Sequence, residues 1–183
     1  MSLMAFGFGS FPGVADNPSR FAAFAASPQA EILDVSYAVV DLRIAQLSNE
    51  ALDVIAFGIA AKSTRPRIEI CARNRDSSTV ADVDGVIREG LIESDAPELI
   101  PGYWIEPLLV ALAPFDIETS DDAGGYLCNH LYWRLLRRPQ GAAVFIHLPP
   151  GREPEWYAEL GAACAEAIRC WDRRTPCGVS FPG

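Results

Sequence analysis

Apolar residues follow two different periods along the chain, one typical of strands and one typical of helices. Nearly continuous apolar runs of strand length occur at residues 5–9, 53–61 and 142–148, as expected for strands covered on both faces of a parallel sheet. Weaker strand patterns lie at residues 31–35 and 115–119. Helical stripes alternate with these strands. The pattern therefore predicts an α/β fold, a three-layer α/β/α sandwich with a mostly parallel, doubly wound sheet.

Five helices are predicted by apolar stripes and by start and stop signals. The first has Asn17 as its N-cap, Pro18 at its first helical position and Pro28 just beyond its end. The other four are marked by apolar side chains on one face. These are Val40, Ile44 and Leu47 in the second helix, Ile105, Leu108, Leu109 and Leu112 in the third, Cys128, Leu131 and Leu135 in the fourth, and Trp156, Leu160, Ala163, Cys164, Ala167 and Trp171 in the last.

Residues 67–72 alternate in a strand pattern that includes a carboxylate. Ile68 and Ile70 are expected on one side of this strand and Glu69 on the other. Glu69 is thus an acidic residue on a strand that otherwise resembles core, and a solvated strand face is the alternative. Residues 76–102 are then polar with little periodicity. They predict a long surface excursion, and a loop of that length is often functional.

Composition narrows the class of protein. The chain has 183 residues, half of them hydrophobic, so residues 1–183 are expected to form a single domain. The net charge of −9 and the pI near 4.7 argue against nucleic acid or an anionic membrane surface as a partner. No apolar run reaches membrane-spanning length, and glycine, proline and Asp16 interrupt the N-terminal region before a signal-peptide core forms.

The cysteines indicate a reducing compartment. Their number, five, is odd, and their spacing fits neither a disulfide framework nor a C-x2-C zinc site. We therefore expect reduced thiols and a cytosolic, that is cytoplasmic, protein. Cys164 is expected in the core of the last helix, whereas Cys170 and Cys177 have no assigned role.

Cys128 follows a loop, residues 120–126, that contains two consecutive glycines. The glycines permit a tight turn or a close backbone approach, and the spacing after them places the thiol in the first turn of a helix. Unpaired N–H groups and the positive end of the helix dipole favour a thiolate there, although Asp121 and Asp122 oppose it. A buried, unreactive cysteine is the alternative, because free thiols in cores are commonly inert.

The chain has two histidines, His130 and His147. His147 stands at the carboxyl end of a strand, where open α/β sheets bind their ligands, although a structural histidine is the alternative. His130 lies two positions from Cys128 on the same helix, a spacing that points the two side chains to different faces. His147 is therefore the better candidate for a general base.

Phe8 and Phe11 lie on a Gly/Pro-rich loop, residues 7–13. The glycine spacing does not match a dinucleotide-binding fingerprint, and a proline interrupts it. Two phenylalanines on such a loop favour the wall of an apolar pocket, with ordinary core anchoring as the alternative.

The sequence thus places a cysteine at a helix start, a histidine at a strand end and a carboxylate on a neighbouring strand. These three residue types can serve as a nucleophile, a general base and an orienting group. Four segments carry a resemblance to a known family: residues 7–13 with Asn17-Pro18-Ser19, residues 69–74, residues 120–129 and residues 145–149. The AG-x-Y-x-CN pattern is the most specific of them. The chain resembles the pyroglutamyl peptidase, or pyrrolidone-carboxylate peptidase, family of cytosolic cysteine peptidases, which remove an N-terminal pyroglutamyl residue from peptides.

The resemblance implies a role for each of these residues. It implies Cys128 as the nucleophile that forms a thioester, His147 as general base and then acid, and Glu69 as the group that orients the imidazole. The substrate pocket would be formed by Phe8 and Phe11 on the faces of the lactam ring, by Asn17, and by the backbone of Leu127. The resemblance implies no metal and no organic cofactor. Its expected partners are N-terminally pyroglutamylated peptides, and it leaves open assembly into a homodimer or homotetramer.

The chain departs from the family pattern in residues 58–65, where most glycines are absent and a polar ligand contact near Ile59 is missing. Ile70 also replaces the basic residue usual after the glutamate. A second hypothesis is therefore a catalytically weak homologue that binds pyroglutamyl-like small ligands. A thiol redox protein, the third hypothesis, is disfavoured because the chain has no C-x-x-C pair.

Overall fold

A computed structural model describes residues 3–11, 13–47 and 51–171. Six strands of the described residues form one sheet in the order β2-β1-β3-β10-β4-β9, and only the β10–β4 pair is antiparallel. The sheet is therefore mostly parallel, as predicted. Its strands are β1 (Leu3–Phe8), β2 (Ala30–Leu33), β3 (Asp53–Ile59), β4 (Arg67–Glu69), β9 (Glu118–Ser120) and β10 (Ala143–Leu148).

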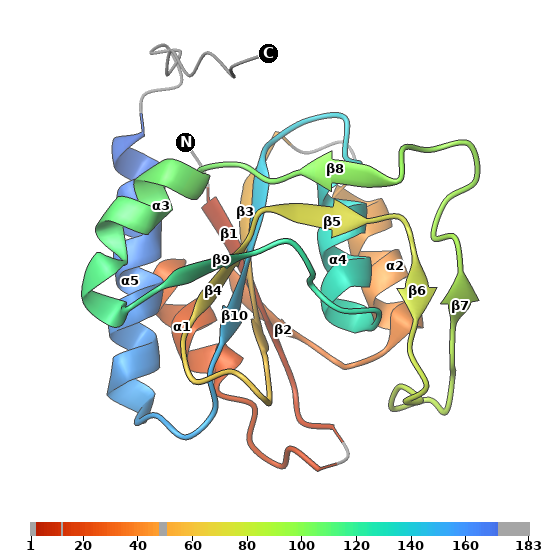
Figure 1. Cartoon of the computed structure of the whole chain (residues 1–183), viewed down its shortest axis with the longest axis horizontal. Coiled ribbons are helices and arrows are strands. Elements are labelled where there is room, and N and C mark those ends of the chain that lie inside the picture. The colour runs from red at the N-terminus through yellow and green to blue at the C-terminus, as the bar shows by residue number, and fades with distance from the viewer. Residues whose placement is uncertain (1–2, 12, 48–50, 172–183) are drawn as a thin grey trace.

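Helices cover both faces of this sheet, which confirms the predicted three layers (Figure 1). One face is covered by α1 (Ser19–Ala26), α3 (Ile105–Ala111) and α5 (Pro154–Cys170), and the other by α2 (Tyr37–Leu47) and α4 (Leu127–Leu136). A short 3-10 helix, Ala113–Phe115, precedes β9. No helix in the described ranges combines the length and the apolar character needed to span a membrane.

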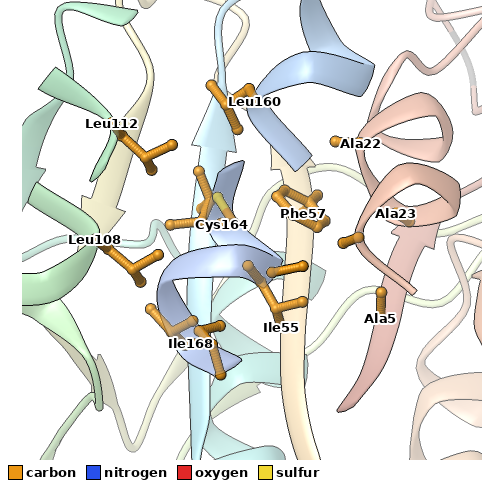
Figure 2. Packing of buried hydrophobic residues seen from close by; sticks show 14 of the residues in the cluster. Ala5, Ala22, Ala23, Ile55, Phe57, Leu108, Leu112, Leu160, Cys164 and Ile168 are labelled. Carbon is orange, nitrogen blue, oxygen red and sulfur yellow. The ribbon is translucent and has the colours of Figure 1, made fainter. Parts of the chain in front are cut away.

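Each face of the sheet has its own hydrophobic core. Figure 2 shows the core under α1, α3 and α5, in which Ile55 and Phe57 of β3 meet Cys164 of α5. These side chains point to one face because alternate residues of a strand do so. Cys164 is fully buried, as predicted, and burial raises the pKa of its thiol, so it stays an unreactive core residue. Cys170 is exposed, and Cys177 lies outside the described residues.

The strand predicted at residues 67–72 is divided in two. β4 ends at Glu69, and the chain then leaves the main sheet to form β5 (Cys71–Arg73), which pairs with β8 (Leu99–Pro101). Ile70 between them is 37% exposed instead of sharing the buried side with Ile68. The reason lies in its backbone, which bonds Ser120 and Gly102 at the point where the chain changes partners.

Residues 76–102 form a surface excursion, as expected, but it is not wholly irregular. Besides β8 it contains β6 (Asp76–Ser77) paired with β7 (Glu89–Gly90), and in Figure 1 the short ladders lie on the α4 side of the main sheet. The side chain of Asn74 fixes the base of the excursion through bonds to the backbone of Glu93 and Ala96.

Two helix predictions need correction. α1 begins at Ser19, one residue later than expected, but the Asn17 side chain still accepts a hydrogen bond from the Ser19 N–H at 3.2 Å. In α5 the buried face is rotated from the predicted one, and Trp156, Ala163, Ala167 and Trp171 lie only at its edge. The buried residues of this helix are Tyr157, Leu160, Gly161, Cys164, Ala165 and Ile168.

Gly161 explains the rotation of α5. A Cβ atom at this position would overlap the backbone of Ala22 in α1, so only glycine allows the two helices to come this close. We predict that Gly161→Ala lowers the free energy of unfolding by about 1–3 kcal/mol through overpacking, although helix propensity alone would raise it by about 1 kcal/mol.

Urea unfolding measures this difference, with Ala162→Gly on the exposed side of the same turn as the matched control. The control should lose only the propensity difference of about 1 kcal/mol. A Gly161→Ala variant that is more stable than the native protein would contradict the close contact of α1 and α5.

Candidate active site

Two hollows meet at the N-terminal end of α4, where Cys128 lies. The smaller, of about 70 Å³, is mostly apolar and is lined by Phe8, Phe11, Asn17, Val35, Ile59, Tyr126, Leu127 and Cys128. The larger, of about 540 Å³, is more polar and is lined by Ile59, Ala60, Ala61, Lys62, Ser63, Arg67, Glu69, Asp122, Ala123, Gly124, Tyr126, Cys128 and His147. Ile59, Tyr126 and Cys128 line both. All seven residues singled out from the sequence therefore line one hollow or the other.

The antiparallel register of β10 and β4 brings His147 and Glu69 together. Glu69 stands opposite Phe145, and His147 lies two residues beyond Phe145 on the same face of the sheet. A diagonal pair of this kind is within reach of a long side chain. Nδ1 of His147 lies 2.7 Å from Oε1 of Glu69. Glu69 is thus a buried hydrogen-bond partner of His147, and the solvated alternative for it is wrong.

Charge around His147 holds a proton on its ring. Burial alone would lower the pKa of His147, but the Cys128 sulfur and the Glu69 carboxylate beside it raise that pKa to about 10. Because Oε2 of Glu69 has no hydrogen-bond partner among the described residues, the carboxylate is anchored by its bond to His147. The imidazole is therefore held between a carboxylate on one side and a thiol on the other.

A glycine makes room for the thiol. Gly58 of β3 stands directly opposite His147 in the parallel β3–β10 pair, so both lie on the face covered by α4. A Cβ atom on Gly58 would come within 2.9 Å of Cys128 Sγ and 2.8 Å of the Phe145 ring. The one glycine of the altered segment 58–65 thus lies where the sulfur needs space.

The two glycines before α4 have different functions. Gly124 has a φ angle of +83°, which a residue with a side chain rarely adopts, and forms the turn. Gly125 lies against β6, where its carbonyl accepts a hydrogen bond from the Ser77 N–H at 2.8 Å. Both predicted uses of the glycine pair, a tight turn and a close backbone approach, are therefore present.

The N-terminus of α4 faces the junction of the hollows without a side-chain cap. Tyr126 precedes the helix in an extended conformation, and no side chain of the described residues bonds the first N–H groups. Asp122 is exposed and accepts a bond from the Gly124 N–H instead. Free N–H groups and the positive helix end can therefore stabilise negative charge at Cys128.

The phenylalanine loop is held in place by polar bonds. Phe8 ends β1, and its N–H donates to the Ser19 hydroxyl at 2.9 Å. Phe11 forms a short bridge with Val14, and Nδ2 of Asn17 donates to the Gly9 carbonyl at 3.1 Å. Asn17 thus fixes the loop through one side of its amide, in addition to lining the apolar hollow.

Three residues that line the smaller hollow were not singled out from the sequence as site residues. Val35 follows β2, and Ile59 ends β3, so the carboxyl-end rule for open α/β sheets could have identified both. Tyr126 is the tyrosine of the AG-x-Y-x-CN pattern, and its hydroxyl donates to the Ala81 carbonyl of the excursion. Its side chain joins the site to residues 76–102, a contact that no local pattern reveals.

His130 points away from the site, as its spacing predicted. Its ring is buried between Asp76 of β6, at 2.9 Å, and Asp41 of α2, at 3.1 Å. Burial alone would lower the pKa of His130, but the hydrogen bonds and charges of the two carboxylates raise it overall. Arg88 and Arg134 also bond Asp41, so His130 belongs to a structural network. Within the described ranges, no three His, Cys, Asp or Glu side chains are grouped to hold a metal ion.

Sequence comparison relates the chain to two groups of peptidases. No family model matches it. It is similar to pyroglutamyl-peptidase 1 of Rattus norvegicus, with 27% identity over 120 residues that cover 63% of this chain and 57% of the rat protein. It is also similar to a pyrrolidone-carboxylate peptidase of Alkaliphilus oremlandii, with 28% identity over 167 residues that cover 81% of this chain and 78% of that protein. The chain thus spans little more than half the length of the mammalian relative.

Solved structures show the same fold. A mutant pyrrolidone carboxyl peptidase from Pyrococcus furiosus superposes with a TM-score of 0.80 at 22% identity, covering 91% of this chain and 97% of that one. The enzyme from Thermus thermophilus gives a TM-score of 0.77 at 23% identity, covering 91% and 96%. The α/β fold is therefore shared, and the resemblance drawn from the sequence motifs is confirmed by relatives of the same name.

The His130 network predicts a pH-dependent stability. The pKa of His130 in the folded protein lies above its ordinary value of 6.5. The free energy that the protonated ring contributes to folding is therefore fully present below pH 6.5 and is lost as the pH rises through the folded-state pKa. We predict that His130→Gln, which stays neutral and leaves Asp76 without a cation, lowers the free energy of unfolding by about 3 kcal/mol at pH 5.5 to 6.

Urea unfolding of both proteins across a pH series measures this effect. The difference between the native protein and His130→Gln should shrink as the pH rises above neutrality. A difference that is constant with pH, or that grows in alkaline solution, would show that His130 is not a protonated bridge between the two carboxylates.

Proposed function

Because the chain is related in sequence and in fold to the pyrrolidone-carboxylate peptidases, we propose that it is a cysteine-type omega peptidase that removes an N-terminal pyroglutamyl residue from peptides. One observation carries this proposal. Cys128 lies where a small apolar hollow meets a wider, less apolar one that contains the His147–Glu69 pair. A substrate with a small ring at one end and a peptide at the other fits such a junction.

The apolar hollow suits a flat lactam ring. Phe8 and Phe11 supply apolar surface for its faces, and Asn17 and the Leu127 backbone supply polar groups for its edge. A small neutral ligand is bound in this way, by apolar walls with a few placed hydrogen-bonding groups. A site that bonds the lactam edge also rejects rings that lack these polar atoms. In this proposal the peptide beyond the scissile bond lies in the wider hollow.

The first half of the reaction forms a thioester. In the resting site the proton of the Cys128 thiol lies on His147, and the Cys128 thiolate attacks the carbonyl carbon that joins pyroglutamate to the next residue. N–H groups at the start of α4 stabilise the oxyanion, each by about 3 kcal/mol in comparable sites. His147, held by Glu69, then gives its proton to the departing amine as the C–N bond breaks. The raised pKa of His147 keeps this proton available at neutral pH.

The second half releases the acid. His147, now neutral, accepts a proton from a water molecule, whose oxygen attacks the thioester carbonyl. The C–S bond breaks, free pyroglutamate leaves, and sulfur departs as a thiolate beside the imidazolium, which restores the resting site. Glu69 keeps its charge throughout and holds the imidazole in the required tautomer. Every step uses groups of this chain and water, so the proposed mechanism requires neither a metal nor an organic cofactor. We place this reaction in the cytoplasm, with pyroglutamylated peptides as partners.

One observation favours a second candidate, a weakly catalytic protein that binds pyroglutamyl-like ligands. Ile59 lines both hollows, and the segment that follows it to Ser63 lines the larger one. This is the place where a polar ligand contact was expected from the family pattern, and an isoleucine cannot donate a hydrogen bond there. Weaker positioning of the ring would lower turnover more than it lowers binding.

Release of a reporter amine from a pyroglutamyl amide tests the proposal. The native protein should release the amine, and Cys128→Ala should lower the rate by at least about 10³-fold because the nucleophile is lost. Cys164→Ala, which removes a buried thiol of the opposite core, is the matched control and should keep the native turnover.

Equal rates for the native protein and Cys128→Ala would refute the peptidase. No release at high protein concentration, together with binding of free pyroglutamate, would favour the second candidate instead.

A further inference from the structure

The residue after the candidate nucleophile is buried and makes three hydrogen bonds to one strand segment. Oδ1 of Asn129 accepts from the Arg73 N–H at 2.9 Å, and Nδ2 donates to the carbonyls of Arg73 and Arg75, each at 2.9 Å. The side chain is inaccessible to solvent. An amide that donates and accepts on the same strand fixes both the distance and the register of that strand.

These bonds join the helix that carries Cys128 to the chain segment that follows Glu69. Asn129 follows Cys128 directly, and Arg73 ends β5, which is separated by one residue from β4 and Glu69. Figure 1 shows α4 beside this part of the chain, and the Tyr132 hydroxyl, one turn later, donates to the Glu69 carbonyl at 2.9 Å. Directional hydrogen bonds from Asn129 and, one turn later, from Tyr132 thus hold α4, which carries the sulfur, against the chain segment that contains Glu69.

Apolar packing alone would not fix this geometry. Leu131 of α4 belongs to the same apolar cluster as Phe145 and Ala56 of the sheet, and apolar packing of this kind is not directional. A helix held only by them can shift by a fraction of an ångström at little cost. Catalysis is more demanding, because a misplacement of about 1 Å can reduce a rate by about 10²-fold. The buried amide supplies the directional constraint that the packing lacks.

We propose that Asn129 is a positioning residue that fixes Cys128 relative to the His147–Glu69 pair by binding the first turn of α4 to β5. The proposal deepens the proposed peptidase function and rests on it for its kinetic test. It also makes a claim that does not depend on turnover, since the position of the thiol beside the imidazole governs its reaction with any electrophile. Asn129 itself does not touch the reacting atoms.

The chain offers a matched control in Asn74. This residue is also buried, and its side chain likewise makes three bonds to backbone, accepting from the Glu93 N–H and donating to the carbonyls of Glu93 and Ala96. These bonds join Asn74 to the surface excursion, and none of them is made to a residue of α4. Asn74→Ala and Asn129→Ala should therefore weaken the fold to a similar extent, while only the second releases the helix that carries Cys128.

The experiment compares the two variants in kinetics, thiol reactivity and urea unfolding. Asn129→Ala should lower kcat on a pyroglutamyl amide about 10²-fold and raise KM much less, because Phe8, Phe11 and Asn17 lie outside α4 and only Leu127 among the ring-binding groups belongs to it. The alkaline limb of its pH–rate profile should move to lower pH as the sulfur leaves His147. Iodoacetamide should alkylate Cys128 more slowly as well. Asn74→Ala should keep kcat, the pH profile and the alkylation rate within about twofold of native, the range of an uninvolved site.

A milder variant guards against loss of the fold. Asn129→Ser keeps a hydroxyl that can bond Arg73, and it should fall between the native protein and Asn129→Ala in both kcat and alkylation rate. Equal losses of kcat in Asn74→Ala and Asn129→Ala, or native alkylation in folded Asn129→Ser, would overturn the positioning role. If the native protein released no amine, the peptidase proposal would fail alone, and the alkylation rates would still decide the role of Asn129.

Discussion

The hydrogen bond between His147 and Glu69 depends on one reversal of strand direction in an otherwise parallel sheet. β4 lies antiparallel to β10, which sets Glu69 opposite Phe145 and places His147 at the diagonal position on the same face. A buried carboxylate and imidazole are a costly way to stabilise a fold, because desolvation offsets much of their attraction. The pair is consistent with a site in which the imidazole must be oriented and kept protonated, as the proposed mechanism requires.

The rest of the site is arranged around this pair by small residues and directional bonds. Gly58 leaves space for the sulfur opposite His147, and the glycine turn before α4 delivers an uncapped helix end to the same place. Asn129 and Tyr132 then bind that helix to the strand segment that contains Glu69. The geometry of three reacting groups thus rests on contacts that are individually modest but that all restrain the same short distances.

Sequence patterns predicted the elements of this arrangement better than their connections. Apolar periods locate β3, β10 and the helices because burial alone determines them, and the glycine pair with its helical spacing predicts Cys128 at a helix start. The reversed direction of β4 was not predictable, since an alternating strand pattern is the same in either orientation. Asn129 was missed as well, because its partner Arg73 lies 56 residues away and a buried amide resembles any polar residue in a helix.

Glu69 is proposed to act through His147, and the pH–rate profile of Glu69→Gln shows whether it does. Glutamine keeps the shape of the side chain but removes the charge that helps to raise the pKa of His147. We expect kcat on a pyroglutamyl amide to fall on the order of 10²-fold or more, with the alkaline limb of the profile moved to lower pH, because the imidazolium loses its proton at a lower pH. A native kcat with an unmoved alkaline limb would contradict this role of Glu69.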